Sequence, residues 1–234
     1  VDLAMAGRLR PPENLPVSFD CRDKWPVLRA VLDQPVQQNA GTCWIHAPAV
    51  GWKCYALQQS GWQSEDLREL SHLCTEERVM RLCGVASAED GGNPAHALEC
   101  LTGAPPMRVG HGRTEHERVE EICRWIEHKG PVVSTGFEVT ADFTGAPEGA
   151  YDTQSGHTTP RGLHAVVIDG WKKMPYGQWA WLVKNSWGDR LNHKEVPFGQ
   201  DGIDAGVLGI PRFPLGYPAP SPIPRWRLAI SGEP

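Results

Sequence analysis

The sequence lacks three features that would each point to a particular class of protein. No run of about 18 apolar residues is present, so no transmembrane helix is expected. Lys and Arg number 23 against 28 Asp and Glu, and this net charge of −5 offers no basic surface for nucleic acid. No two cysteines have C-x-x-C spacing, so a structural zinc site is not expected. An initiator Met and a signal-like segment are also missing, which predicts a processed chain or one that begins inside a longer precursor.

What is present allows a substantial fold. The 234 residues suffice for one large domain or two packed halves, and 25 glycines with 21 prolines predict many turns rather than a helix bundle. The seven cysteines are an odd number, so at least one is unpaired or bridges to another chain. They stand at positions 21, 43, 54, 74, 83, 100 and 123.

Helical signals dominate the first half of the chain. Helices are expected over residues 44–60, 64–83 (in two pieces), 93–101 and 114–130. Pro48, one turn into the first of them, should kink it or cost a few kcal/mol of stability. Asn93 has the position of a cap for the third, and Thr114 with Glu117 has capping-box spacing at the start of the last.

Strand signals dominate the second half. "PVVSTGFEV", "LHAVVIDGW" and "QWAWLVKNSW" are short, apolar and β-branched, with Gly and Pro turns between them. A helical half packed on a strand half gives an α+β architecture. Residues 1–13 are expected to be a polar N-terminal tail, and the Pro-rich "PRFPLGYPAPSPIPRW" near the C-terminus an extended surface strap.

Two of these strands are expected to form a hairpin, at about 164–171 and 178–185. A turn centred between Met174 and Pro175 would place His164 opposite Asn185 in the ladder, with Cβ atoms about 5 Å apart. A slip of one residue in the turn would remove this pairing.

The stretch "NAGTCWIHA" places Cys43 at the expected start of a helix. A helix N-terminus stabilises a thiolate, and so does a nearby imidazolium. An asparagine beside the imidazole can fix its orientation. Cys43, His164 and Asn185 therefore form a candidate nucleophile, base and orienting group, although a single cysteine is more often buried as a small apolar residue. The other histidines, His46 among them, are expected to have no chemical role.

Five motifs in order give the chain a family resemblance. They are "LPVSFDCRD", "GTCW", "LCGVASAEDGGN", "LHAVVIDGW" and "VKNSWG". Over about residues 15–190 the chain resembles the papain family of cysteine peptidases, and its pattern is closest to the cathepsin X branch. The resemblance implies a papain-like two-lobed α+β fold over residues 14–234. The helical lobe would span about 27–110, and the β-rich lobe about 111–234 together with the N-terminal segment.

The same resemblance implies roles for individual residues. The active site would lie in the cleft between the lobes, where Cys43 attacks the peptide carbonyl and His164 protonates the leaving amine. Trp187 would cover the Asn185 side chain. The substrate-binding residues would be Gly41, Gly91, Gly92 and Trp187. No metal or organic cofactor is implied, and the partner is a peptide or protein substrate.

The glutamine of the oxyanion hole has three candidates. The usual family spacing selects Gln37, six residues before Cys43. The cathepsin X pattern has a three-residue insertion after the glutamine, which selects Gln34. Gln34 is preferred here, and Gln37 and Gln38 are the alternates. The backbone N–H of Cys43 would be the second donor.

Several departures from the family keep a second function open. Both ends of one family disulfide are replaced, by Ala40 and Glu89, and Cys83 lacks its usual partner, for which Cys74 or Cys100 could substitute. Pro35 stands where cathepsin X has the histidine behind its carboxypeptidase preference. The alternative to an active peptidase is a catalytically silent papain-like structural or binding subunit of a larger assembly. A lysosome-like or secreted setting follows from the resemblance, and the lost disulfides suit a reducing or organellar one.

Overall fold

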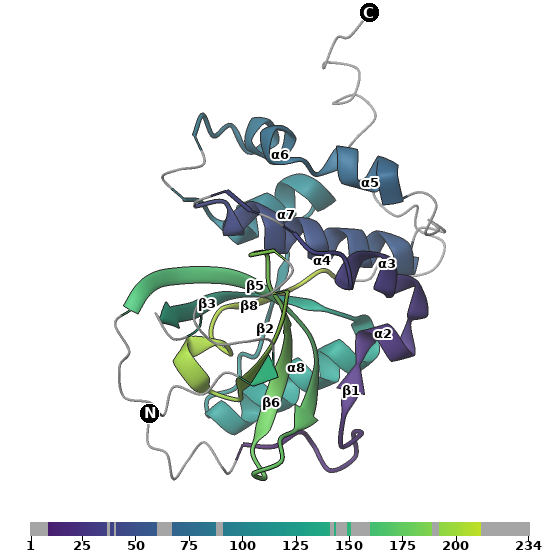
Figure 1. Ribbon diagram of the computed structural model, residues 1–234, viewed down its shortest axis with the longest axis vertical. Coiled ribbons are helices and arrows are strands. Elements are labelled where there is room, and N and C mark those ends of the chain that lie inside the picture. The colour runs from purple at the N-terminus through teal and green to yellow at the C-terminus, as the bar shows by residue number, and fades with distance from the viewer. Residues whose placement is uncertain are drawn as a thin grey trace, which may run out of the picture.

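In the computed structural model, a group of helices lies against one end of a twisted sheet, which carries one long helix of its own (Figure 1). The structure describes residues 9–36, 38–39, 41–59, 67–87, 91–140, 143, 149–150, 160–188 and 192–211. The α-helices are α2 (Cys21–Lys24), α3 (Arg29–Leu32), α4 (Cys43–Gln59), α5 (Leu67–Leu73), α6 (Glu76–Cys83), α7 (Pro94–Thr102) and α8 (Glu115–Lys129). Short 3₁₀ turns lie at Pro26–Leu28 and Gln200–Gly202.

Local signals in the sequence set the helix ends. Asn93 accepts a hydrogen bond from the N–H of Ala95 and caps α7, and Thr114 and Glu117 form the predicted capping box of α8. Helices α5 and α6 together form the stretch over 64–83 that was expected to be helical in two pieces. Helix α4 begins at Cys43 and continues across Pro48 as one element.

Among the described residues, eight strands form one sheet. They are β1 (Phe19–Asp20), β2 (Met107–Val109), β3 (Val132–Thr140), β4 (Gly149–Ala150), β5 (Pro160–Lys173), β6 (Trp179–Lys184), β7 (His193–Pro197) and β8 (Val207–Gly209). The order is β2-β8-β3-β5-β6-β7-β4, with β1 also pairing β5. All pairs are antiparallel except β4 with β7. The expected α+β class is therefore confirmed.

The predicted register of the β5–β6 hairpin is wrong. The turn is centred one to one and a half residues later than expected, and the N–H of Gly177 bonds to the carbonyl of Met174 at 2.9 Å. Val167 pairs with Lys184, and the register shifts between Ile168 and Gly170. His164 lies outside the β5–β6 pairing and instead pairs with Phe137 of β3.

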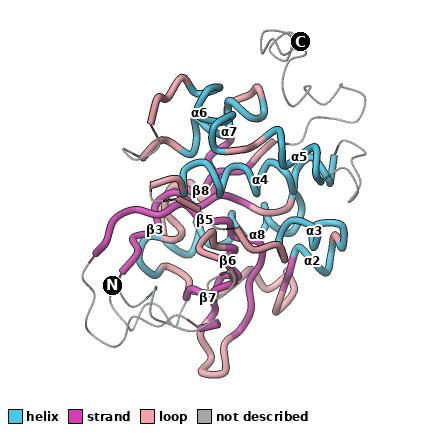
Figure 2. Tube along the Cα trace, turned by 45° about the horizontal axis from the view of Figure 1, so that its top comes forward, coloured by secondary structure: helices cyan, strands magenta, loops and turns pink. Residues whose placement is uncertain are grey.

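Helix α4 joins the two parts of the molecule. It packs against α7, α6 and α3 on one side and against β5 and β3 of the sheet on the other. The trace in Figure 2 shows the same arrangement, with α4 between α7 and the strands. The core on both sides of α4 contains large buried aromatic rings, which include Trp44, Trp52, Trp171 and Trp181.

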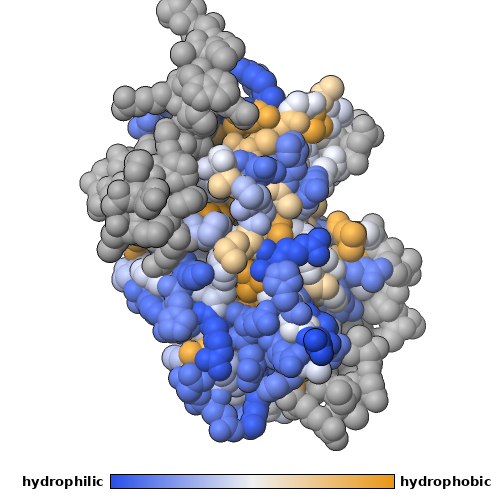
Figure 3. Space-filling model, turned by 180° about the vertical axis from the view of Figure 1, so that it is seen from behind, coloured by the Kyte–Doolittle hydropathy of each residue, from blue (hydrophilic) through white to orange (hydrophobic). Residues whose placement is uncertain are grey.

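The hydropathy of the surface differs between the helical end and the sheet end of the molecule. Viewed from behind, the lower part of the described surface is mainly hydrophilic, and the hydrophobic residues gather toward the middle and the helical end (Figure 3). No helix among the described residues is both long and apolar enough to cross a membrane.

The described residues nearest the N-terminus pack against the rest of the molecule. The tail expected over residues 1–13 is wrong for its described part, because Leu9, Pro11 and Pro12 are buried, and Leu9 packs beside Gly199. The apolar side chains of these residues explain why they pack. The C-terminal strap lies outside the described residues.

The lobe boundary near residue 110 stays a prediction, and β2, just before it, already pairs with β8.

Candidate active site

The structure places Cys43 at the first position of α4, where it is half-buried. A turn leads into the helix: the hydroxyl of Thr42 donates to the carbonyl of Asn39 at 2.8 Å, and Gly41 has φ 78°. The carbonyl of Thr42 then accepts from the N–H groups of Ile45 and His46. The thiol therefore lies at the positive end of a long helix, as the sequence predicted.

A carboxylate from another helix holds this turn. Glu76, the first residue of α6, accepts hydrogen bonds from Asn39 Nδ2 at 2.7 Å and His46 Nε2 at 2.6 Å. It also lies 2.9 Å from Thr42 Oγ1, whose single hydrogen it shares with the Asn39 carbonyl. Burial opposes ionisation of Glu76, but the bonds from His46, Asn39 and Thr42 outweigh it and lower the pKa of the carboxyl to about 2. His46, expected to have no chemical role, thus helps to hold the turn between Asn39 and Cys43, called the nucleophile turn.

His164 and Asn185 meet through their side chains. The Nε2 atom of His164, on β5, lies 2.7 Å from the Oδ1 atom of Asn185, which follows β6. An amide oxygen only accepts, so Nε2 carries the ring proton and Nδ1 is the nitrogen with a lone pair. The predicted proximity is thus present, although the ladder register that led to it is wrong.

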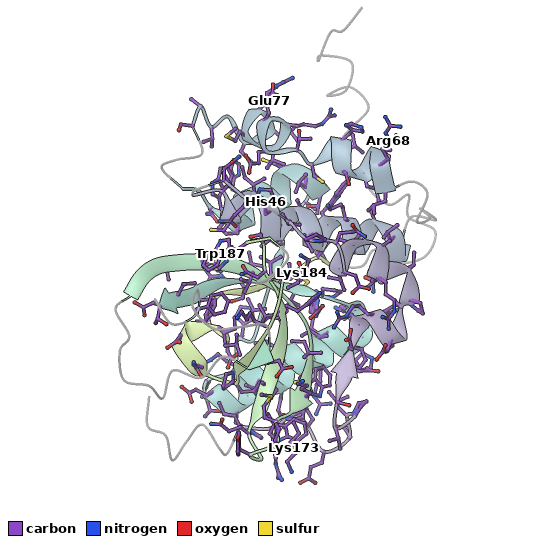
Figure 4. The ribbon with its side chains drawn as sticks, in the orientation of Figure 1. His46, Arg68, Glu77, Lys173, Lys184 and Trp187 are labelled. Carbon is purple, nitrogen blue, oxygen red and sulfur yellow. The ribbon has the colours of Figure 1, made fainter. Side chains whose placement is uncertain are left out.

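His164 is buried, and its imidazole lies against the ring of Trp187. The ring of Trp187 stacks on the imidazole, with centroids 4.3 Å apart. Figure 4 shows Trp187 where the helical end meets the sheet, below His46. Burial lowers the pKa of His164 to about 4, and the hydrogen bond to Asn185 acts in the opposite direction. The imidazole is therefore neutral near pH 7 and can accept a proton.

One cavity brings the reactive groups together. It has a volume of about 380 Å³ and is lined by Gln38, Gly41, Cys43, Val139, Gly162, Leu163, His164 and Trp187. Five residues singled out in the sequence, Gln38, Gly41, Cys43, His164 and Trp187, thus share one space, and Asn185 adjoins it through His164. A thiol and a neutral imidazole in one cavity, with an amide that orients the imidazole from outside it, can carry out nucleophilic attack with proton transfer.

The glutamine in this cavity is Gln38. Its N–H donates to the carbonyl of Ser186 at 2.9 Å, and its Oε1 atom accepts from the Ser186 hydroxyl. The N–H of Gly188 also bonds to the carbonyl of Val36 at 2.8 Å. Because the amide oxygen is engaged by Ser186, the NH₂ group of Gln38 is left to donate elsewhere.

The preferred candidate, Gln34, lies elsewhere. It is exposed in the turn after α3, where its N–H bonds to the carbonyl of Val31 at 3.3 Å. It does not line the cavity that holds Cys43. Gln37 lies outside the described residues, as do Ala40 and Glu89.

The two glycines expected on the substrate side are not among the described residues that line the cavity. Gly91 has φ 74°, and Gly92 lies against the ring of Trp44, the residue after Cys43. A Cβ atom at Gly92 would come within 2.3 Å of that buried ring. Contact with the start of α4 therefore explains why position 92 is a glycine.

This contact makes Gly92→Ala a test of the packing. Since Trp44 is buried and cannot move freely, the extra methyl group is expected to lower the free energy of unfolding by about 1–3 kcal/mol. The measurement is the urea unfolding midpoint. Gly84→Asn is the control, because position 84 has open space and a left-handed conformation that Asn tolerates. An unchanged midpoint for Gly92→Ala would contradict the packing described here.

Three features of the structure have no signal in the sequence. Glu76 stands 33 residues after Cys43 in an ordinary helical pattern, and nothing in the spacing links it to the nucleophile turn. The choice of Gln38 among three glutamines depends on Ser186, which is distant in the chain. Cys83, His96 and Cys100 also come together, away from the cavity, as the only group of potential metal ligands found among the described residues.

Comparison with known proteins gives this geometry a context. The family model described as "Papain family cysteine protease" matches residues 105–195, which include His164 and Asn185 but not Cys43. A cathepsin B-like cysteine proteinase 3 from Caenorhabditis elegans is 26% identical over 229 residues, 78% of this chain and 61% of the relative. Pro-cathepsin H from Bos taurus is 48% identical over 88 residues, 36% of this chain and 25% of the relative. The chain therefore spans less than two thirds of the length of these curated relatives.

Solved structures agree at the level of the fold. The procathepsin B S9 structure from Trypanosoma congolense has a TM-score of 0.63 with 19% identity, covering 89% of this chain and 85% of that chain. The bromelain protease from Ananas comosus has a TM-score of 0.58 with 18% identity, covering 83% and 98%. These likenesses support the two-part fold. The cathepsin X pattern stays a prediction.

Proposed function

Because the chain belongs to the papain family of cysteine peptidases, we propose that it hydrolyses peptide bonds through an acyl-enzyme on Cys43. The observation that supports this most is the shared cavity of Cys43 and His164, with Asn185 bonded to His164. The substrate is a peptide or protein. A lysosome-like or secreted compartment is part of the proposal and follows from the family resemblance alone.

The first half of the reaction forms the thioester. His164 Nδ1 takes the thiol proton, and the sulfur of Cys43 attacks the carbonyl carbon of the peptide. The electron pair of the carbonyl moves onto its oxygen, where the Cys43 N–H and the Gln38 NH₂ donate hydrogen bonds. The intermediate then expels the amine, which leaves with the proton held by His164.

The second half releases the acid. Water enters the site of the departed amine, and neutral His164 takes one of its protons as the oxygen attacks the thioester carbon. The carbon–sulfur bond breaks, and Cys43 leaves as a thiolate that recovers the proton from His164. Asn185 keeps the imidazole in one orientation through both halves, and the stacked Trp187 shields it from water.

The test is covalent labelling of the nucleophile. An epoxysuccinyl inhibitor is expected to add one adduct mass to the chain, and peptide mapping is expected to place it on Cys43. The four buried cysteines, Cys21, Cys54, Cys74 and Cys123, have little access to reagent. Burial also raises the pKa of each of these thiols.

Cys43→Ala is the control and should take up no adduct. If the wild-type chain also stays unlabelled and cleaves no unfolded protein substrate, the silent structural subunit is the better description. An adduct confined to Cys83 or Cys100 would equally reject Cys43 as the nucleophile.

The pH profile tests the role of His164. Its neutral form is the base, and its pKa is lowered from 6.5 to about 4. Activity should therefore be retained as the pH falls through 6.5 and lost as it falls through about 4. The measurement is kcat/KM from pH 3 to 8 with an uncharged peptide ester. An acid limb at the ordinary histidine value would contradict a buried imidazole.

A further inference from the structure

Two helices of the helical end carry a group of sulfur and nitrogen atoms that the peptidase reaction does not use. Cys83 is the last residue of α6, and His96 and Cys100 stand one turn apart on α7. Helices α6 and α7 pack against each other and lie side by side in both views (Figures 1 and 2). One ligand atom from each of the three residues lies within 4.8 Å of the other two.

The separation of His96 and Cys100 is close to that of two ligands of a tetrahedral metal ion. The sulfur of Cys100 is 3.8 Å from Nε2 and 4.0 Å from Nδ1 of His96. Zinc with Zn–S bonds of about 2.3 Å and Zn–N bonds of about 2.1 Å holds its sulfur and nitrogen ligands about 3.6 Å apart. The observed separations differ from this by a few tenths of an ångström, which a side-chain rotation can supply.

The residue types favour zinc in particular. Two thiols and one imidazole are ligands that Zn²⁺ prefers, whereas Ca²⁺ and Mg²⁺ require oxygen. A histidine and a cysteine at i and i+4 face the same side of a helix, and the end of α6 brings the third ligand to that side. His96 is exposed, and Cys83 and Cys100 are half-buried, so an ion can enter from solvent.

We propose that Cys83, His96 and Cys100 bind one Zn²⁺ ion, with a water molecule or an external ligand in the fourth position. The ion would join the end of α6 to the first two turns of α7. It would thereby tie together the two ends of the segment that contains Gly91 and Gly92, and no disulfide occurs among the described residues to do so. Closing this segment would stabilise the contact of Gly92 with Trp44 beside the nucleophile.

A second place among the described residues could also attract zinc. Cys43 and His164 share the candidate active-site cavity, and a thiol with an imidazole there can bind the same ion. The experiment is therefore done on the full chain carrying Cys43→Ala, purified under reducing conditions. This makes the outcome independent of whether the chain is a peptidase.

The test is titration with Co²⁺, followed by displacement with Zn²⁺. One Co²⁺ per chain is expected, with a thiolate-to-metal charge-transfer band in the near ultraviolet and a tetrahedral visible spectrum. Zn²⁺ should displace the cobalt, also at one ion per chain. Cys100→Ser and His96→Ala should each weaken Zn²⁺ binding by at least about tenfold.

Matched controls keep the result specific. Cys74→Ala and His72→Ala remove the same residue types from α5 and the turn after it, and should leave Zn²⁺ binding unchanged. Far-ultraviolet circular dichroism checks that each variant is folded. If Cys100→Ser or His96→Ala does not fold, Cys83→Ser replaces it as the ligand variant. The proposal is overturned if binding survives both ligand substitutions. It is also overturned if peptide mapping finds a Cys83–Cys100 disulfide in the freshly purified chain.

Discussion

Gln38→Ala is expected to lower kcat about 100- to 1000-fold, with little change in KM. Negative charge appears on the carbonyl oxygen only as the tetrahedral intermediate forms, so a donor aimed at that oxygen acts mainly on the transition state. Gln38 lines the cavity with Cys43, and Ser186 engages its amide oxygen. The NH₂ group is therefore the part of Gln38 that can serve as this donor.

Gln34→Ala is the matched control for this prediction. It removes the same side chain from an exposed turn outside the cavity, and should cost under about tenfold, well below the loss of a true oxyanion donor. Gln37→Ala should behave like Gln34→Ala. Steady-state kinetics on one peptide substrate separates the three variants. A large loss of kcat in Gln34→Ala, with Gln38→Ala near wild type, would restore the register of the cathepsin X pattern.

Glu76→Ala is expected to have the second large effect, through the position of the nucleophile rather than through contact with substrate. The substitution leaves Asn39, Thr42 and His46 without their shared acceptor. Each hydrogen bond to a charged group contributes about 1.5–3 kcal/mol, so the unfolding free energy should fall by at least one such amount. A displaced nucleophile turn can lower kcat by up to about 100-fold.

The controls for Glu76 are close in sequence and in size. Glu76→Gln retains one acceptor oxygen and should lie between wild type and Glu76→Ala in both stability and kcat. Glu77→Ala removes an exposed carboxylate that pairs with Arg81 and points away from the body at the helical end, and it should change neither (Figure 4). Equal effects of Glu76→Ala and Glu77→Ala would show that Glu76 does not position the turn.

The pH dependence of stability gives Glu76 a separate signature. Its folded pKa of about 2 is lowered from an ordinary value of 4.5, so its contribution is fully present above about pH 4.5 and is lost as the pH falls toward 2. Urea unfolding at pH 3 and pH 6 should therefore differ less in Glu76→Gln than in wild type. The carboxylate would keep the nucleophile turn in place in a mildly acidic compartment.

Much of the local structure was determined by the sequence itself. Asn93 caps α7, and Thr114 with Glu117 caps α8, because a short polar side chain can satisfy free N–H groups only a few residues away. The start of α4 at Cys43 and the strands around His164 and Asn185 followed from similar short-range patterns. These signals, with the motif order, were sufficient for the fold class and for the three main candidates of the site.

Contacts between segments that are distant in the sequence decided the hairpin register and the residues around Cys43. The register of the β5–β6 hairpin shifts between Ile168 and Gly170, and β1 lies so close there that a Cβ atom at Gly170 would be 2.1 Å from the Phe19 carbonyl oxygen. Ser186 selects Gln38, and Glu76 reaches the nucleophile turn from another helix. Spacing along the chain shows which side chains can meet within one element. Only the packing of elements shows which side chains meet across the fold, because that depends on every surface that each element buries.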